Sequence, residues 1–201
     1  MLTENRIDRL NTVASKRIHD VVVLENIHDP HNAAAALRNC DAFGFQQIHV
    51  IFETEKEYNP EKLGKLTSAS ANRWLSVTTW KSSLECFTHL KTEGFYLAAT
   101  AIDVTAQSFD TFQTPNKPTA FIFGNEGFGI TETAKKMADK LIYLLMYGFV
   151  DSLNLSVTVG IVTHKIATER QETGIGRYSQ AESDKLAKQW IAMDEKRRHG
   201  V

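Results

Sequence analysis

Short apolar segments of strand length alternate along this chain with segments that carry helical periodicity. The strand-like segments are rich in β-branched and aromatic residues, and polar loops bound them. Buried strands separated by helices are typical of α/β proteins with a mostly parallel sheet and helices on both faces. We therefore predict a fold of this class, with strands at residues 21–24, 47–52, 74–80, 95–100, 119–123 and 141–145.

Helices are predicted around these strands, at residues 2–15, 33–43, 61–66, 82–93, 131–138 and 180–197. One further stretch is ambiguous. Every second residue from Leu153 to Ile161 is apolar, which favours a strand, whereas Leu155, Val159 and Val162 fit one face of a helix. Periodicity alone favours a strand there.

Composition places the chain among ordinary globular proteins of a reducing compartment. Of its 201 residues, 42% are hydrophobic and 23% are charged, so one domain with a full core is expected. Cys40 and Cys86 show no CxxC spacing and no nearby ligand cluster, which argues against disulfides and against a zinc site. Glu4 and Asp8 stand where a signal peptide needs an apolar core, so we expect a cytoplasmic protein without membrane spans or metal.

Three polar loops follow predicted strands, and in open α/β sheets ligands bind at the carboxyl ends of the strands. In the first loop, Asn32 occupies an expected helix N-cap position, and Gly44 ends the same helix. Arg38 lies on this helix after an apolar run, and a buried arginine needs a carboxylate or phosphate partner. The alternatives are that Asn32 only caps the helix and that Arg38 is only solvated.

The second loop, residues 124–129, is a glycine-rich turn between a strand and a helix, which allows a ligand to approach the backbone closely. It matches neither a Walker A loop nor the GxGxxG spacing of dinucleotide-binding proteins, which argues against a nucleotide-dependent dehydrogenase. Glu126 is the unusual residue in this loop. A surface carboxylate near a helix N-terminus is the alternative explanation for it.

The third loop carries Ser152, Asn154 and Ser156 at a bend between two apolar segments. Helix capping by one of them, or by Asp151, explains one such side chain but not all of them. Together the loops offer an arginine, a carboxylate, amides and hydroxyls, with no nucleophilic triad, carboxylate pair or metal cluster at readable spacing. Such a set suits positioning of substrates and stabilisation of charge rather than covalent catalysis.

The same three stretches resemble the three motifs of the SPOUT RNA methyltransferases. Residues 25–44, which begin Glu-Asn-Ile-His-Asp-Pro-His-Asn, resemble motif one. Residues 123–130, Phe-Gly-Asn-Glu-Gly-Phe-Gly-Ile, resemble motif two, and residues 152–157, Ser-Leu-Asn-Leu-Ser-Val, resemble motif three. In this order they are most similar to the TrmH-type tRNA (guanosine-2'-O)-methyltransferases. The resemblance runs from the N-terminal helix to about residue 171.

This resemblance implies a single SPOUT domain over residues 1–201, with helices at about 1–20 and 177–201 as extensions. It also implies a C-terminal trefoil knot, a helix after Asn154, S-adenosylmethionine as cofactor, tRNA as partner, and homodimers with the active site near the interface. Carried over by position, the catalytic set is Arg38, Asn32, Glu126, Ser152 and Asn154. The cofactor would contact Thr100, Ile102, Gly124, Leu144 and Leu153, and the RNA would contact Arg6, Arg9, His31 and Arg170.

The activity that the resemblance implies is that of a tRNA (guanosine(18)-2'-O)-methyltransferase, which methylates the ribose of a guanosine in the D loop. Because a guanidinium resists deprotonation, we predict that Arg38 activates the 2'-hydroxyl electrostatically and leave the proton acceptor open. Leu145 and Asp151 stand where the family commonly has proline and glutamine. The alternatives are a 2'-O-methyltransferase for ribosomal RNA or another tRNA position, and a non-catalytic RNA-binding protein.

Overall fold

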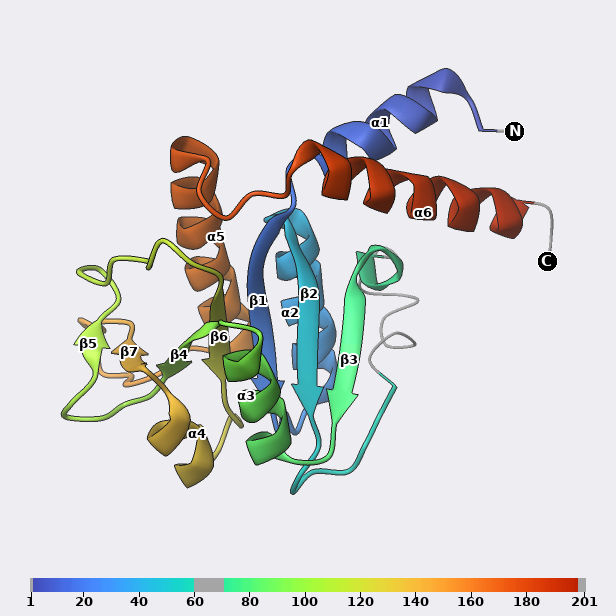
Figure 1. The fold of residues 1–201 in the computed structure, drawn as a ribbon. Helices are drawn as coiled ribbons and strands as arrows, with labels where there is room; N and C mark the ends of the chain where they lie inside the picture. Colours follow the sequence, from blue (N-terminus) through green and yellow to red (C-terminus); the bar gives the residue numbers. More distant parts are fainter. Residues whose placement is uncertain (1, 60–70, 199–201) are drawn as a thin grey trace.

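The computed structural model describes residues 2–59 and 71–198, which contain a seven-stranded sheet with helices on both faces (Figure 1). The strand order is β3-β2-β1-β6-β4-β7-β5, and every neighbouring pair is parallel. The predicted α/β class is therefore confirmed. The strands are β1 (Ile18–Glu25), β2 (Phe45–Ile51), β3 (Ser76–Trp80), β4 (Tyr96–Thr100), β5 (Gln107–Ser108), β6 (Thr119–Phe123) and β7 (Lys140–Tyr143).

Five of the predicted helices are confirmed within the described residues, whereas the short helix at residues 71–74 was not predicted and includes Trp74, which was predicted as the start of a strand. The two-residue strand β5 has no counterpart in the sequence prediction, and the helix predicted at residues 61–66 lies outside the described residues. The helical elements are α1 (Glu4–Ala14), α2 (Pro30–Ala42), the short 3-10 helix η2 (Ala71–Trp74), α3 (Ser83–Thr92), α4 (Glu132–Met137), α5 (Leu155–Thr173) and α6 (Gln180–Arg198).

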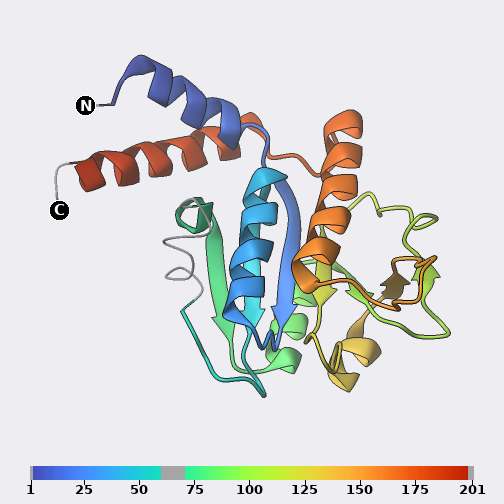
Figure 2. The same ribbon diagram turned by 180° about the vertical axis from the view of Figure 1, so that it is seen from behind.

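Two buried clusters fill the two faces of the sheet. On β1, Val22 and Leu24 belong to the cluster under α2 and α5, whereas Val21 and Val23 belong to the cluster under α3 and α4. Figures 1 and 2 show these helix pairs on opposite sides of the sheet. Because both faces of β1 are covered, the strand is apolar along most of its length instead of alternating with polar residues.

The ambiguous stretch is helical. Leu155, Val159 and Val162 are buried, while Val157 and Ile161 are about half exposed, so the buried residues form one stripe of a helix that packs on α2. The strand that alternation favours is therefore wrong, and the helix that the family resemblance implies is confirmed. The trefoil knot stays a prediction.

Helix α2 begins two residues before the predicted N-cap. Asp29 is the N-cap, with its side chain accepting a hydrogen bond from the His31 amide, and Pro30 occupies the first helical position. Proline is well suited to this position because its missing N–H needs no partner there and its φ angle is already helical. The prediction of Asn32 as N-cap is therefore wrong, and its side chain is available for other contacts.

Helices α1 and α6 pack on each other at the amino-terminal edge of the sheet (Figure 1). Their shared cluster includes Leu10 and Trp190, and Arg6 forms a salt bridge of 2.8 Å with Asp194. The buried guanidinium of Arg17 lies over the Trp190 ring and connects this pair to the sheet. Among the described residues, no helix has both the length and the apolar character needed to cross a membrane.

Candidate active site

The predicted site residues lie in loops that leave the same edge of the sheet. Since all strand pairs are parallel, the predicted loops, which follow β1, β6 and β7, all leave the carboxyl edge of the sheet, and those after β1 and β6 lie at the lower edge in Figure 1. β1 and β6 are neighbours in the sheet, so the loop that leads into α2 lies beside the glycine-rich loop, while β7 and its following loop lie beyond β4. The predicted gathering of polar loops is therefore confirmed.

A directed chain of hydrogen bonds connects the three motifs. The Asn154 side-chain amide donates to Asn32 Oδ1 at 2.9 Å, and the Asn32 amide donates to Glu126 Oε1 at 2.9 Å. Asn154 also caps α5, because its Oδ1 accepts from the Ser156 amide at 2.8 Å. Capping and site assembly are thus combined in one side chain, and the cap fixes which end of the Asn154 amide faces Asn32.

Glu126 anchors the start of α2 to the glycine-rich loop. Its Oε2 accepts a hydrogen bond from the His28 amide at 3.0 Å, and its Oε1 lies 3.4 Å from the Asp29 amide. The loop itself is closed by paired backbone hydrogen bonds of 2.9 and 2.8 Å between Asn125 and Gly129. A Cβ atom at Gly124 would lie 2.2 Å from the Gly129 carbonyl carbon, so this closed loop requires glycine there.

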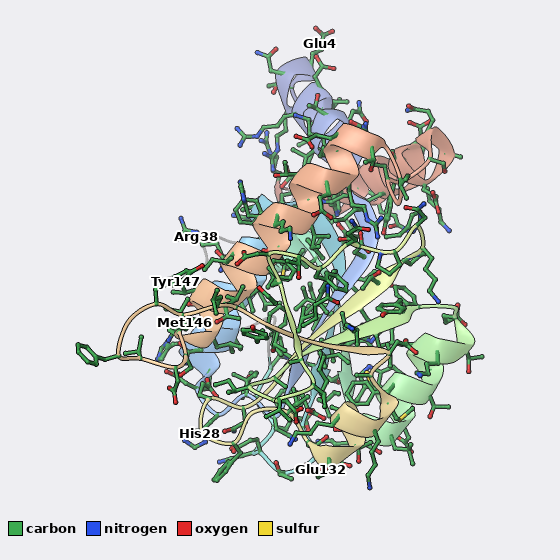
Figure 3. All side chains as sticks on the ribbon, turned by 90° about the vertical axis from the view of Figure 1, so that its left-hand side faces the viewer. Glu4, His28, Arg38, Glu132, Met146 and Tyr147 are labelled. Carbon is green, nitrogen blue, oxygen red and sulfur yellow. The ribbon has the colours of Figure 1, made fainter. Side chains whose placement is uncertain are left out.

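Arg38 lines a cavity of about 830 Å³ between α2 and α5. It is exposed, so the burial inferred from the apolar run before it is wrong. The neighbouring Asn39 amide donates to the Ser156 carbonyl oxygen at 2.6 Å, which holds α2 against the start of α5. Figure 3 shows Arg38 on the same side of the molecule as Met146 and Tyr147 of the segment before α5. The cavity is lined by His31, Ala35, Arg38, Asn39, Phe43, Ser156, Val157, Gly160, Ile161, His164 and Lys165.

The cavity combines cationic groups with apolar walls. Arg38 and Lys165 provide cationic side chains, and His31 and His164 provide imidazole rings. Val157 and Ile161 provide apolar surface beside them. Such a lining suits a ligand with a phosphate and an apolar part. Since Arg38 and Ser156 share the cavity, a single copy of this chain brings the arginine and the third motif together.

Ser152 and the predicted cofactor residues lie on neighbouring loops. β4 pairs with both β6 and β7, so the loops that carry Ile102, Gly124 and Leu153 leave adjacent strands. Ile102 is 75% exposed and Leu153 is 37% exposed, and the adenosine part of a cofactor would cover such surface. Ser152 is exposed and makes no hydrogen bond to Asn32, Glu126 or Asn154 within the described part of the chain.

Thr100 and Leu144 occupy the ends of this group of loops. Thr100 closes β4 and donates from its hydroxyl to the Ile122 carbonyl oxygen at 3.1 Å. Leu144 follows β7 and packs against the main core. Both positions place main-chain groups near the carboxyl edge of the sheet, where a cofactor bound by main-chain groups of the protein would lie.

The four residues predicted to contact RNA fall into different environments. Arg9 and His31 are exposed, whereas Arg6 is partly buried in its salt bridge with Asp194. The predicted RNA contact of Arg170 is wrong. Its guanidinium is buried and binds both carboxylate oxygens of Asp20, at 2.7 and 2.9 Å. A buried and paired guanidinium cannot reach a phosphate, so Arg170 stabilises the fold instead of binding RNA.

The loop after β2 also contributes to the site, although no motif in the sequence indicates it. His28 Nδ1 lies 3.0 Å from Glu55 Oε2, and the Asn125 amide donates to Glu55 Oε1 at 3.3 Å. The hydrogen bond to Glu55 and the negative charge of this carboxylate raise the pKa of His28. Because Glu55 also follows a strand that ends at this edge, its position after β2 was the available signal. Among the described residues, no group of histidine, cysteine and carboxylate side chains is arranged to hold a metal.

The chain is similar to known proteins that share one name. The tRNA (guanosine(18)-2'-O)-methyltransferase of Thermus thermophilus is 35% identical over 176 residues, covering 86% of this chain and 87% of the relative. The protein of the same name from Aquifex aeolicus is 29% identical over 198 residues, covering 96% and 92%. The crystal structure of the A. aeolicus TrmH/SpoU tRNA-modifying enzyme matches with a TM-score of 0.80 over 95% of this chain and 97% of that one, at 29% identity.

A more distant structure shares the fold alone. It is the SpoU methyltransferase AviRb from Streptomyces viridochromogenes in complex with AdoMet, which matches with a TM-score of 0.66 at 19% identity over 77% of this chain and 59% of that one. A model of the SpoU rRNA methylase family matches residues 20–164, the region that holds all three motifs. With relatives of this identity and coverage, the chain belongs to the SpoU rRNA methylase family.

Proposed function

We propose that this chain is a tRNA (guanosine(18)-2'-O)-methyltransferase, which transfers a methyl group from S-adenosylmethionine to the ribose of a D-loop guanosine. Relatives named for this activity include the T. thermophilus protein and an Escherichia coli protein that is 30% identical over 177 residues. One observation carries the proposal: all three motifs meet at one place. Arg38 shares a cavity with Ser156 of α5. Asn154, which caps α5, is hydrogen-bonded through Asn32 to Glu126.

The loops after β4, β6 and β7 form the cofactor site. Ile102 and Leu153 offer apolar surface there, and Gly124 keeps the backbone of the glycine-rich loop closely folded beside them. Such a mostly apolar lining with a few polar groups fits an adenosine. S-adenosylmethionine, when bound, supplies an electrophilic methyl group on a sulfonium sulfur.

Arg38 stabilises the charge that develops on the ribose oxygen. A 2'-hydroxyl is a poor nucleophile until its proton leaves, and a nearby guanidinium favours the alkoxide form. The guanidinium itself remains protonated, so it acts as an electrostatic activator and not as the base. It also suits the phosphate next to the ribose, which would place the hydroxyl. RNA is the substrate class because DNA lacks this hydroxyl.

Asn32, Glu126 and Asn154 hold the loops in register. Glu126 accepts every hydrogen bond that the structure gives it, from two backbone amides and from Asn32, so it acts as an anchor. Ser152 lies exposed in the segment between β7 and α5, where it shapes the cofactor pocket. These residues position the reacting groups, a contribution that can be as large as that of the charged group.

The protein works as a homodimer, with the second copy covering the face that carries the cavity. Val157 and Ile161 on α5 are about half exposed, and Tyr147 and Phe149 in the preceding segment are almost fully exposed. Apolar surface of this extent beside a charged cavity is typical of an interface. Arg9 and His31 contact the RNA. The chain from β7 to α5 contributes to the family's trefoil knot. The protein acts in the cytoplasm, where tRNA is modified.

The test is methylation of an unmodified tRNA transcript with labelled S-adenosylmethionine, followed by nuclease mapping of the methylated ribose. We expect the label on the 2'-oxygen of guanosine 18. A transcript with 2'-deoxyguanosine at this position is the matched control and accepts no label. Label on a base, on another nucleotide or on ribosomal RNA alone would overturn the assignment, and binding of tRNA without any transfer would indicate a non-catalytic binding protein.

A further inference from the structure

Glu25, the last residue of β1, is a buried carboxylate directly behind the glycine-rich loop. It is 0% exposed, and both of its oxygens accept hydrogen bonds. Oε1 accepts from the hydroxyls of Ser83 at 2.6 Å and Thr131 at 2.7 Å, and Oε2 accepts from the Thr131 amide at 2.9 Å. None of the catalytic roles above uses this group, although a buried carboxylate is costly unless its oxygens are satisfied.

Two helices begin at this carboxylate. Ser83 is the first residue of α3, and Thr131 is the N-cap of α4, with its hydroxyl oxygen accepting from the Ala134 amide. The positive ends of the two helix dipoles therefore lie near Glu25, which favours a negative charge there. Hydrogen bonds to a charged acceptor are also stronger than those between neutral groups. The carboxylate is thus a firm attachment point for both helices.

Two neighbouring residues, Glu25 at the end of β1 and Asn26 directly after it, hold both arms of the glycine-rich loop. Glu25 holds the outgoing arm at Thr131, and the backbone carbonyl of Asn26 accepts from the Asn125 side chain on the incoming arm at 2.8 Å. Asn26 adopts a positive φ of 54°, an uncommon conformation for which asparagine is one of the better suited residues. Between these two attachments the loop presents Glu126 to Asn32.

We propose that Glu25 is the positioning residue of the glycine-rich loop. From within the core, it fixes the conformation of the loop surface that contacts Asn32 and the cofactor. The loop carries three glycines, so it is intrinsically flexible and needs attachments at both ends. Loss of the Glu25–Thr131 contact would release the outgoing arm. Cofactor binding would then be weaker, and Glu126 would be less well aligned with Asn32. The effect on cofactor binding rests on the methyltransferase function proposed above.

Thr131→Asp separates this positioning role from helix capping. Aspartate is as good an N-cap as threonine, so α4 keeps its start, but its carboxylate cannot donate to Glu25 and repels it. Thr131→Ser keeps both the cap and the donor and is the matched control. Ser83→Ala removes a hydrogen bond to the same carboxylate on the α3 side, away from the loop. Thr131→Val, which keeps the volume but loses the N-cap oxygen together with the donor, is measured in parallel in case charge repulsion prevents folding of the aspartate variant.

Two readouts are taken on the full-length protein: amide hydrogen exchange of the segment 124–131, and calorimetric affinity for S-adenosylmethionine. We expect faster exchange in this segment and about tenfold weaker cofactor binding for Thr131→Asp and Thr131→Val, with Thr131→Ser and Ser83→Ala close to wild type. Unchanged loop exchange in both Thr131→Asp and Thr131→Val, or equal effects from Ser83→Ala, would overturn the positioning role. Failure of the wild type to bind the cofactor would instead overturn the proposed function, while the exchange measurement would still test the loop attachment.

Discussion

The side-chain amide of Asn154 donates a hydrogen bond of 2.9 Å to Asn32, which lies 122 positions away in the sequence. Each of the two side chains has its other end fixed: Asn154 Oδ1 caps α5, and Asn32 Nδ2 is held by Glu126. Neither amide can turn over without losing a second contact. The three motifs therefore form one structural unit, and a substitution of any of these side chains should alter the contacts of the others.

Asn154 provides a pair of variants that separate stability from activity. Asn154→Asp keeps an oxygen to cap α5 but places a second oxygen opposite Asn32 Oδ1, so we expect nearly wild-type stability with at least tenfold slower methylation. Asn154→Ala loses the cap as well and should cost about 1 kcal/mol of unfolding free energy. Denaturant unfolding and initial rates of methylation check both. Wild-type activity of Asn154→Asp would show that the link to Asn32 has no catalytic importance.

Arg170 should matter for folding and not for RNA binding. Arg170→Met leaves the buried carboxylate of Asp20 without its partner, and removal of one member of such a pair typically costs about 3–5 kcal/mol. Thermal unfolding would measure this loss, with the exposed Arg177→Met as control. If Arg170→Met unfolded like the wild type but bound tRNA more weakly, the structural role assigned to Arg170 would be wrong.

His49 makes the stability of the protein sensitive to acid. Burial, with a smaller contribution from His89, lowers the pKa of His49 from 6.5 to about 4. Its Nδ1 accepts a hydrogen bond from the Trp80 ring N–H at 2.9 Å, and protonation of Nδ1 removes this acceptor. Since the unfolded chain binds the proton more readily, stability is fully present above pH 6.5 and falls as the pH drops from there toward 4.

The size of this effect follows from the difference in pKa. Between pH 7.5 and 4.5, His49 should account for a loss of about 2–3 kcal/mol of unfolding free energy. His49→Gln keeps a side chain that can accept from Trp80 but does not titrate in this range. The wild type should therefore lose more stability than His49→Gln over the same interval in denaturant unfolding. Parallel curves for the two proteins would exclude His49 as the source.

The proposed dimer predicts that a charge on the exposed face of α5 separates the subunits. Ile161→Glu introduces a carboxylate into the apolar wall of the cavity, where pairing with a second copy would bury it. Light scattering after size-exclusion chromatography should find a monomer. Leu84→Glu, an equally polar change at an exposed position on α3, should leave the dimer intact. A dimer that survives Ile161→Glu would place the interface elsewhere.

Local patterns predicted the elements of the fold well, because most strands are buried on both faces and most helices carry clear end signals. They failed where two periods fit the same residues. Leu155 and Val159 satisfy both a strand and a helix, and only their packing on α2 decides between them. The N-cap prediction for Asn32 is wrong because Asp29 followed by Pro30 is a stronger helix start signal.

The site was predicted in part. The resemblance supplied Asn32, Glu126 and Asn154, which the structure joins by hydrogen bonds. Charge alone cannot distinguish an arginine that meets RNA from one that is buried, and Arg170 was misassigned for this reason. Glu25 begins the stretch that resembles motif one, but nothing in the sequence indicates its role, because that role depends on two helices that begin at it from distant parts of the sequence.

Arg38 carries the central claim, that a guanidinium in the cavity between α2 and α5 activates a ribose hydroxyl. The decisive measurement is the single-turnover rate of methyl transfer to unmodified tRNA by Arg38→Ala, with cofactor affinity measured by calorimetry on the same preparation. We predict a rate lower by a factor of about 100 to 1000, with cofactor affinity within twofold of the wild type. A rate close to that of the wild type would contradict the claim.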